Sequence, residues 1–533
     1  MRTQLSQSIW CARAALAVAV LLVASLASAQ TIGGSIAGVV RDTSGAVMPG
    51  VTIEAASPAL IEGVRSAVTD GQGQYRIPEL RPGLYTVTFT LPGFSVVRRE
   101  GLELTTGFTA TVNADLRVGG LEETITVAGA SPVVDIQNIR TQNVFSRELL
   151  DTLPVNRSVA GFATLTLGAS LPPTSQNVGG NQSETSSGGS TFSIHGGRGD
   201  DQKLLLDGMM AADASFAAVT NKNVINTLAV QEMIFQTGGM SAESETGGVQ
   251  INVVPKEGGN KFNFYFKAEG SNASMQTENL TDELVAKGLR IPPSVKQIYD
   301  MGGAVGGPIS RDKIWFFLAS RMWGSQNYSA SNFFNKTQSQ YLGSPNSGIS
   351  AYTPDLERRA YTNGYLKDIF NIRITWKATE KAKLNFAQNF QRHCDCYRGV
   401  EGLLAPEAVA QRIYGPTGVS QVTWNYPASN RLLFEAGNTV SLYFAETGRA
   451  PGILETDLPV TEQNGCGAIP GGYRWGASES ATTNYASKYK KSHQANQRFV
   501  ASLITGSHTV KTGISTQIGH QFDRTESNYL KVP

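Results

Sequence analysis

Apolar and polar residues alternate with a period of two through much of the second half of the chain. FNFYFKAEG places Phe262, Phe264 and Phe266 on one face and mostly polar residues on the other. NIRITWKA (371–378) and KLNFAQNF (383–390) repeat the pattern on either side of a short turn. Successive side chains of a β-strand point to opposite faces of its sheet. The alternation therefore predicts antiparallel strands with one apolar face each.

The connections between these strands differ in length. Residues 379–382 form a tight turn, whereas the polar stretch 271–297 and the Gly/Pro/Tyr-rich region 398–428 are expected to be long loops. Soluble antiparallel sheets also alternate. Apolar faces rich in aromatics, segments of ~10 residues and loops long on one side only are typical of outer-membrane strands. The pattern favours a transmembrane barrel wall, with room after Asn260 for roughly eight to twelve strands.

The first third of the chain shows a different strand pattern. Residues 31–118 contain several short strand-like segments separated by Gly-rich turns, among them SIAGVVRD and TDGQGQYRI. In GLYTVTF, the residues Tyr85, Val87 and Phe89 fall on one face, as in a half-buried strand. These features predict a small β-sandwich.

The stretch GGAVGGPISRDKIWFF (302–317) allows two interpretations. Its glycines suggest a phosphate-binding loop, but such a loop needs a helix after it and usually a Lys-Ser/Thr pair. Here Arg311–Lys313 forms a turn and Ile314–Ser320 is a strand with aromatic residues on both faces. We therefore interpret the glycines as a strand that lies close against a neighbour or against another domain.

Composition narrows the class of protein. The chain carries 45 basic and 43 acidic residues, so it lacks the basic excess of a nucleic-acid-binding protein. The N-terminal residues 1–29 combine Arg2 and Arg13, an apolar run and Ala27-Ser28-Ala29, which predicts a secretory signal peptide cleaved after Ala29. No other apolar stretch could form a spanning helix, so membrane residence requires a closed barrel.

Candidate chemistry is sparse. Cys394, Cys396 and Cys466 remain after cleavage of the signal peptide, and a closed zinc site needs four ligands. A disulfide in a loop, or free thiols, is the expected state. The five histidines are scattered, and we find no catalytic constellation, metal site or cofactor motif. The sequence thus predicts a protein that is not an enzyme.

Residues 31–118 resemble the carboxypeptidase regulatory-like domain, a transthyretin-like sandwich with a carbohydrate-binding-like fold. The resemblance rests on GVVRDTSGAVMPGVTI, TDGQGQYRIPEL and PGLYTVTF. It does not imply peptidase activity, because no H-x-x-E zinc pair is present.

The segment GLEETITVAG (120–129) alternates as an extended strand. One interpretation is the last strand or linker of the sandwich. The other is a peptide that adds to the sheet edge of a partner. In this place it resembles a TonB box, in which Glu123, Thr124, Ile125, Thr126 and Val127 would bind a TonB-type energy-transducing protein.

Residues 130–256 resemble the plug domain of TonB-dependent receptors. SRELLDTLPVNR predicts a short helix and turn, and residues 249–253 alternate as a strand. The resemblance assigns the plug signatures to Arg198-Gly199 and Leu206-Asp207-Gly208, which would hold the plug's fold and its seat in the barrel. The pattern GG-x-x-GGPI-x-x-DK-x-FFF and the later segment 503–522 are similar to Oar-like members of this family.

The resemblance implies a mainly β architecture. We expect a transthyretin-like β-sandwich (31–118), a TonB box (120–129), an α+β plug (130–256) and the N-terminal part of a transmembrane antiparallel β-barrel (260–533). Receptors that hold a plug have barrels of about 22 strands, so the chain is expected to be part of a longer protein.

The implied function is energy-coupled uptake across the outer membrane, with the sandwich in the periplasm. The expected partners are a TonB-type protein, outer-membrane lipid and an unspecified small-molecule, glycan or peptide substrate, with no nucleic acid and no cofactor. The alternative is a non-transporting surface or adhesion protein anchored by the barrel.

Overall fold

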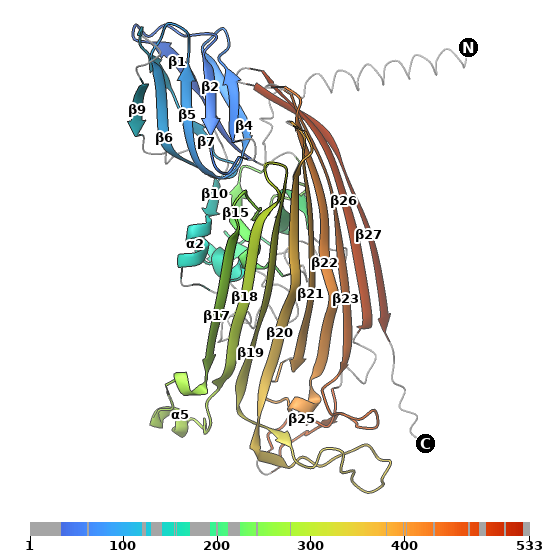
Figure 1. Ribbon diagram of the computed structural model, residues 1–533. Coiled ribbons are helices and arrows are strands. Elements are labelled where there is room, and N and C mark those ends of the chain that lie inside the picture. The colour runs from blue at the N-terminus through green and yellow to red at the C-terminus, as the bar shows by residue number, and fades with distance from the viewer. Residues whose placement is uncertain are drawn as a thin grey trace, which may run out of the picture.

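The chain folds into a sandwich, a small central domain and a long curved sheet (Figure 1). The computed structural model describes residues 33–60, 63–119, 124–128, 141–153, 155, 157–170, 192–198, 201–211, 224–240, 243–277, 279–379, 381–397, 399–400, 402–429, 432–466, 469–478, 487–505 and 508–525. The predicted signal peptide lies outside the described residues. The mainly β fold class predicted from the sequence is confirmed.

The N-terminal domain is a sandwich of two sheets. One sheet has the order β4-β1-β7, with β8 also paired to β1, and the other has the order β3-β2-β5-β6-β9. Its strands are β1 Gly34–Asp42, β2 Thr52–Ala56, β3 Val64–Val68, β4 Gln74–Leu80, β5 Gly83–Thr90, β6 Val96–Leu104, β7 Thr109–Thr111, β8 Ala114–Leu116 and β9 Thr124–Ala128. Tyr85, Val87 and Phe89 point into the core between the sheets, as their alternation predicts.

The central domain is small and mixed. Its five-stranded sheet has the order β10-β15-β16-β13-β14. Its elements are β10 Thr141–Phe145, α2 Arg147–Thr152, α3 Val159–Ala163, β11 Ala169–Ser170, β12 Ser193–Ile194, β13 Lys203–Leu206, β14 Met209–Met210, the 3-10 helix η3 Thr227–Ala229, β15 Val230–Gly238 and β16 Gln250–Pro255. The helix and strand expected around 147–152 and 249–253 are thus present. Among the described residues, none of the helices has the length and apolar character needed to cross a membrane.

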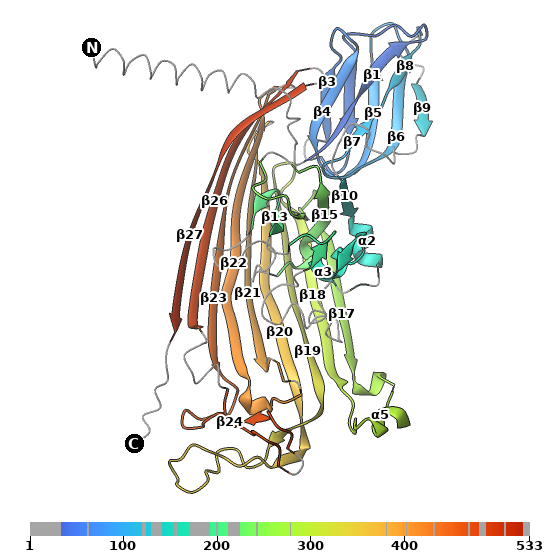
Figure 2. The same ribbon diagram turned by 180° about the vertical axis from the view of Figure 1, so that it is seen from behind.

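The C-terminal half forms one antiparallel sheet of nine strands in chain order. Its strands are β17 Asn263–Asn272, β18 Ser294–Ser310, β19 Ile314–Asn335, β20 Pro354–Lys377, β21 Lys383–Tyr397, β22 Ala410–Pro427, β23 Leu432–Arg449, β26 Ser487–Thr505 and β27 His508–Thr525. Shorter elements at its far end are η4 Ala273–Met275, α5 Asp282–Ala286, η5 Pro406–Ala408, β24 Val460–Thr461 and β25 Arg474–Trp475. The central domain lies against one face of this sheet (Figures 1 and 2).

The two faces of the long sheet differ in chemistry. Large apolar side chains are exposed along several strands, including Phe264, Trp376, Phe386, Phe499 and Ile514. Polar and charged residues of the opposite face are buried where the central domain covers them, as for Asp300, Arg321 and Arg373. An apolar outer face with a polar inner face is the pattern expected of a transmembrane barrel wall.

Three local expectations were wrong. The region 398–428 is not one long loop, because β22 occupies Ala410–Pro427. Gly415 and Pro416 are accommodated where the pairing register of β22 shifts between Tyr414 and Gly418. The strand that begins at Ile314 extends well beyond Ser320, to Asn335. Cys394 and Cys396 form a disulfide within β21 rather than in a loop, and Cys466 is free.

The glycines of 302–307 lie on β18, as the interpretation of that stretch requires. A Cβ added at Gly302 would lie 2.7 Å from Cδ1 of Leu228, a residue of the central domain, and 2.6 Å from the carbonyl oxygen of Ser320. Gly302 therefore allows η3 of the central domain to approach the sheet closely. The predicted close approach of this strand to another domain is confirmed.

Candidate functional site at the junction of the three domains

The turn Leu206-Asp207-Gly208 has a backbone that explains its composition. Asp207 and Gly208 form the two-residue connection between β13 and β14, with φ angles of 51° and 72°. Two consecutive positive φ angles define a hairpin turn that favours Asp-Gly or Asn-Gly. The Gly208 amide donates to the Asn252 side-chain oxygen at 2.9 Å. The sequence thus fixes a turn that presents Asp207 to the long sheet.

Asp207 forms an ion pair with Arg373 of β20, and this pair joins the central domain to the sheet. Arg373 also donates from Nε and Nη2 to Oε1 of Glu257, at 3.2 and 2.9 Å. The Arg373 side chain is only 3% exposed. A buried guanidinium requires charged partners, because an unpaired buried charge is costly. Asp207 and Glu257 supply that compensation.

Glu257 connects all three domains. It lies between β16 and β17, where the chain leaves the central domain, and it receives Arg81 of the sandwich as a further partner. Lys383 of β21 contacts its carboxylate at 3.1 Å. Burial alone would raise the pKa of Glu257, but Arg81, Lys383 and Arg373 overcome this effect and hold its pKa well below the usual range. We call Arg81, Asp207, Glu257, Arg373 and Lys383 the junction cluster.

A cavity of 740 Å³ lies beside the junction cluster, between the sandwich, the central domain and the sheet. All five cluster residues line it. The three domains therefore meet around space and charged groups instead of a continuous apolar core. Such a contact can open without exposing much apolar surface to water.

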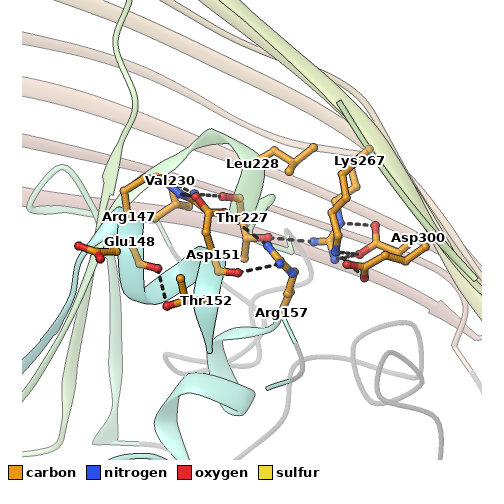
Figure 3. Close-up of polar contacts among 12 residues, drawn as sticks. Arg147, Glu148, Asp151, Thr152, Arg157, Thr227, Leu228, Val230, Lys267 and Asp300 are labelled. Atoms are coloured by element: carbon orange, nitrogen blue, oxygen red, sulfur yellow. Dashed lines mark hydrogen bonds and ion pairs between the residues drawn. The ribbon is translucent and has the colours of Figure 1, made fainter. Parts of the chain in front are cut away.

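A second ion cluster joins η3 to the sheet (Figure 3). Arg321 of β19 binds Asp300 of β18 through two hydrogen bonds of 2.9 Å, and Lys267 of β17 contacts the same carboxylate at 3.2 Å. Arg321 also donates to the Thr227 hydroxyl at 3.4 Å. Figure 3 shows Thr227 between this cluster and Arg147 of α2, which donates to the Thr227 carbonyl at 2.8 Å.

Further polar contacts join the central domain to the sheet, beside two small apolar clusters built on Leu228 and Val224. Asn226 donates to Asp368 at 2.6 Å, and the amide of Val224 donates to Gln391 at 2.9 Å. Side chains of the sheet also donate to backbone carbonyls of the central domain, from Gln421 to Leu206, from Ser441 to Ala211 and from Asn496 to Met210. Each such bond contributes about 1 kcal/mol net. The central domain is therefore held by many small polar terms in addition to the apolar contacts of Leu228 and Val224.

The sandwich meets the central domain at Glu232 of β15. The amide of Thr106 donates to Oε2 of Glu232 at 3.2 Å, and Glu232 is only 3% exposed. Burial raises the pKa of Glu232 from 4.5 to about 7, against the opposing effect of the Thr106 hydrogen bonds. The nearby carboxylate of Glu103 acts in the same direction as burial.

We expect Glu232→Gln to remove a pH dependence of this contact. A carboxyl whose pKa is raised in the docked state stabilises docking below pH 4.5, and this contribution is lost as the pH rises from 4.5 to 7. The loss corresponds to about 3 kcal/mol. Hydrogen exchange of the Thr106 amide, corrected for intrinsic rates, should show protection that falls with pH in the wild type and stays flat in the variant. An identical pH slope in both proteins would contradict this assignment.

The structure describes most of the residues singled out by the sequence. Thr124, Ile125, Thr126 and Val127 lie in β9, which pairs in parallel with β6 of the sandwich. Glu123 and Gly199 lie outside the described residues. Leu206 and Gly208 flank Asp207 in the hairpin. Arg198 is exposed in a turn, where its carbonyl accepts from the Asp201 amide at 3.2 Å, and it is not part of the junction cluster.

Sequence reasoning missed Arg81, Glu257, Arg373 and Lys383. Arg373 occupies the polar face of the alternating segment 371–378, so a charged residue on an inward face was an available signal. Glu257 gave no such signal, because it lies in an irregular connection. Within the described residues, no group of three His, Cys, Asp or Glu side chains is placed to hold a metal ion.

The architecture resembles one class of protein. An antiparallel sheet with an apolar outer face, and a small domain seated on its polar face through ion pairs, is similar to part of a plugged outer-membrane barrel. The sequence comparisons agree. Residues 35–117 match the carboxypeptidase regulatory-like domain. The chain is 31% identical over 277 residues to the TonB-dependent transporter Oar of Myxococcus xanthus, and this match covers 50% of the chain and 24% of that transporter.

The resemblance to Oar-like TonB-dependent receptors is thereby confirmed, over a match that spans about a quarter of the relative's length. Solved structures similar to the chain include the outer-membrane transporter YddB of Escherichia coli, with a TM-score of 0.44 and 10% identity over 70% of the chain and 47% of that structure. The ferric yersiniabactin uptake receptor FyuA of Yersinia pestis gives a TM-score of 0.44 and 11% identity over 73% of the chain and 50% of that structure.

Proposed function

We propose that the chain belongs to a receptor that takes up a substrate across the outer membrane with energy supplied by a TonB-type partner. The observation that carries the proposal is the seating of the central domain, which acts as a plug, on the polar face of a membrane-type sheet. The relation to the TonB-dependent transporter Oar supports it. The sandwich would then lie in the periplasm, and Thr124–Val127 would belong to the TonB box.

The proposed mechanism requires movement and no covalent chemistry, so we assign no catalytic residue. The plug is held by hydrogen bonds and ion pairs of its own edge residues, such as Asp207 and Asn226. Each hydrogen bond of this kind contributes only about 1 kcal/mol net, so the contacts can be exchanged one at a time. A pull on the chain before β10 would therefore shift the plug without unfolding the sheet. The substrate class stays open among small molecules, glycans and peptides.

We expect Ile125→Pro to abolish binding of the partner to the box. Proline removes a backbone N–H and therefore one bond of any ladder that the box forms with another strand. Ile125→Val is the matched control, since it keeps the donor and the strand propensity. Site-specific crosslinking in cells to the TonB-type protein should drop at least about fivefold for the proline variant only, because one lost ladder bond is worth about 1 kcal/mol or more.

Uptake measured with and without the proton gradient provides the second arm of this test. Uptake that depends on the gradient in the Val variant and vanishes in the Pro variant supports the proposal. Substrate binding at the surface without energy-dependent entry would favour the anchored surface protein instead. Equal crosslinking of both variants would reject the box assignment.

A further inference from the structure

The predicted TonB box is already a strand of the sandwich. β9 pairs in parallel with β6, in the register Val96–Thr124, Val97–Ile125, Arg98–Thr126, Arg99–Val127 and Glu100–Ala128. β9 is the last strand in the sheet order β3-β2-β5-β6-β9. One edge of β9 is therefore used by β6, and no other strand of the described residues pairs with its second edge.

The position of β9 at the end of its sheet leaves the second edge without a neighbour among the described strands. Figures 1 and 2 both show β9 on the side of the sandwich turned away from the long sheet. An edge strand presents a row of backbone N–H and C=O groups that an added strand can pair with. The chemistry of this surface fits one kind of occupant, an extended segment of another protein that adds by backbone hydrogen bonds.

Holding the box as a strand lowers the cost of binding. A disordered peptide must lose backbone entropy when it pairs with a partner, and this loss subtracts from the affinity. β6 has already fixed the extended conformation of Thr124–Ala128. If β9 first had to leave β6, its existing ladder would be lost as well. Addition to the free edge avoids both costs.

We propose that the strand of the TonB-type partner adds to the free edge of β9 while β9 remains paired with β6. This inference rests on the proposed function and specifies where its partner docks. The five-stranded sheet of the sandwich becomes a six-stranded sheet shared between two proteins. The partner then pulls on the sandwich as a body, and the sandwich is joined to the plug exit through Arg81 and Glu257.

A disulfide that locks β9 onto β6 tests this proposal. Arg98 and Thr126 are opposite each other in the register, and Arg98 is exposed, so Arg98→Cys with Thr126→Cys should form the lock without disturbing the core. Thr88 is opposite Arg98 on the other side, so Thr88→Cys with Arg98→Cys gives a matched lock between β5 and β6. Both pairs are made in a Cys466→Ser background, because Cys466 is a free exposed thiol.

Each disulfide variant of the full chain is prepared in detergent in its oxidised and in its reduced form. Both forms are titrated with the purified periplasmic domain of a TonB-type protein from the same cell to measure binding affinity. The comparison within one variant removes the effect of the substitutions themselves. The proposal expects the oxidised β6–β9 lock to bind within about threefold of its reduced form, as the β5–β6 lock does. Weakening of more than tenfold on oxidation, confined to the β6–β9 lock, would show that the box must leave the sandwich and would overturn the proposal.

Two other results are also decisive. If the β5–β6 pair oxidises and the β6–β9 pair does not, the two strands are not paired in solution and the proposal fails. If the Ile125→Val protein itself shows no binding to the partner domain, the box assignment in the proposed function fails, independently of the edge on which the partner docks.

Discussion

Arg373→Met should release the central domain from the sheet at the end that lies beside the sandwich. Methionine keeps much of the side-chain volume but leaves Asp207 and Glu257 without their shared cation in a buried setting. Removing one partner from a buried ion pair costs about 3–5 kcal/mol, chiefly because the remaining charge stays desolvated. Protease added to outer-membrane vesicles should cleave within residues 141–256 much faster in the variant than in the wild type.

The matched control for this prediction is Arg392→Met. Arg392 is an exposed arginine of β21, the strand that pairs with β20, and it forms no ion pair with any residue of the described ranges. The Arg392→Met change should leave the rate of protease cleavage unchanged. Adding Asp207→Asn to Arg373→Met should cost less than the sum of the two single changes, since the two residues form one ion pair. Strict additivity of the two changes would mean that the pair does not hold the plug.

Gly302→Ala should unseat the plug at its second attachment, whereas Gly303→Ala should be tolerated. The new Cβ at 302 would lie 2.6 Å from a backbone oxygen of β19 and 2.7 Å from Leu228 of the plug, so the sheet or η3 must shift. At 303 the nearest atom would be 3.4 Å away. Overpacking typically costs about 1–3 kcal/mol.

The two alanine variants differ by one position and lie on opposite faces of β18, which makes them a matched pair. The plug is heated, and its unfolding is monitored by hydrogen exchange of the backbone amides of residues 224–230. These amides should lose protection in the Gly302→Ala variant only. Equal protection in both variants would sink the close-approach argument for Gly302.

The sequence predicted strands and faces better than it predicted partners. Period-two alternation identified β17, β20 and β21, because a strand with one face in lipid and the other in the lumen must alternate. The glycines of β18 predicted the close approach of another segment, because the lack of a side chain is also a local feature of the sequence. By contrast, Arg81 and Glu257 are 176 residues apart, and no local pattern can show that the sandwich and the plug exit meet.

The sequence predicted only one partner of the ion pair between Asp207 and Arg373. The resemblance placed Asp207 in a plug signature, and the positive φ angles at Asp207 and Gly208 give that signature a physical reason. Its partner Arg373 belonged to a face that was predicted but could not be singled out among the other polar residues of the strand. The prediction of a loop at 398–428 was wrong because glycine and proline usually interrupt a strand. Here a register shift accommodates them within β22.

The order of the domains along the chain has a mechanical consequence. β9 lies between two bodies that are each attached to the rest of the molecule, the sandwich through Arg81 and Thr106 and the plug through Asp207 and Thr227. Tension applied at β9 is therefore divided between two anchors in parallel, instead of acting on the plug alone. The anchor with the lower rupture force yields first and transfers the whole load to the other.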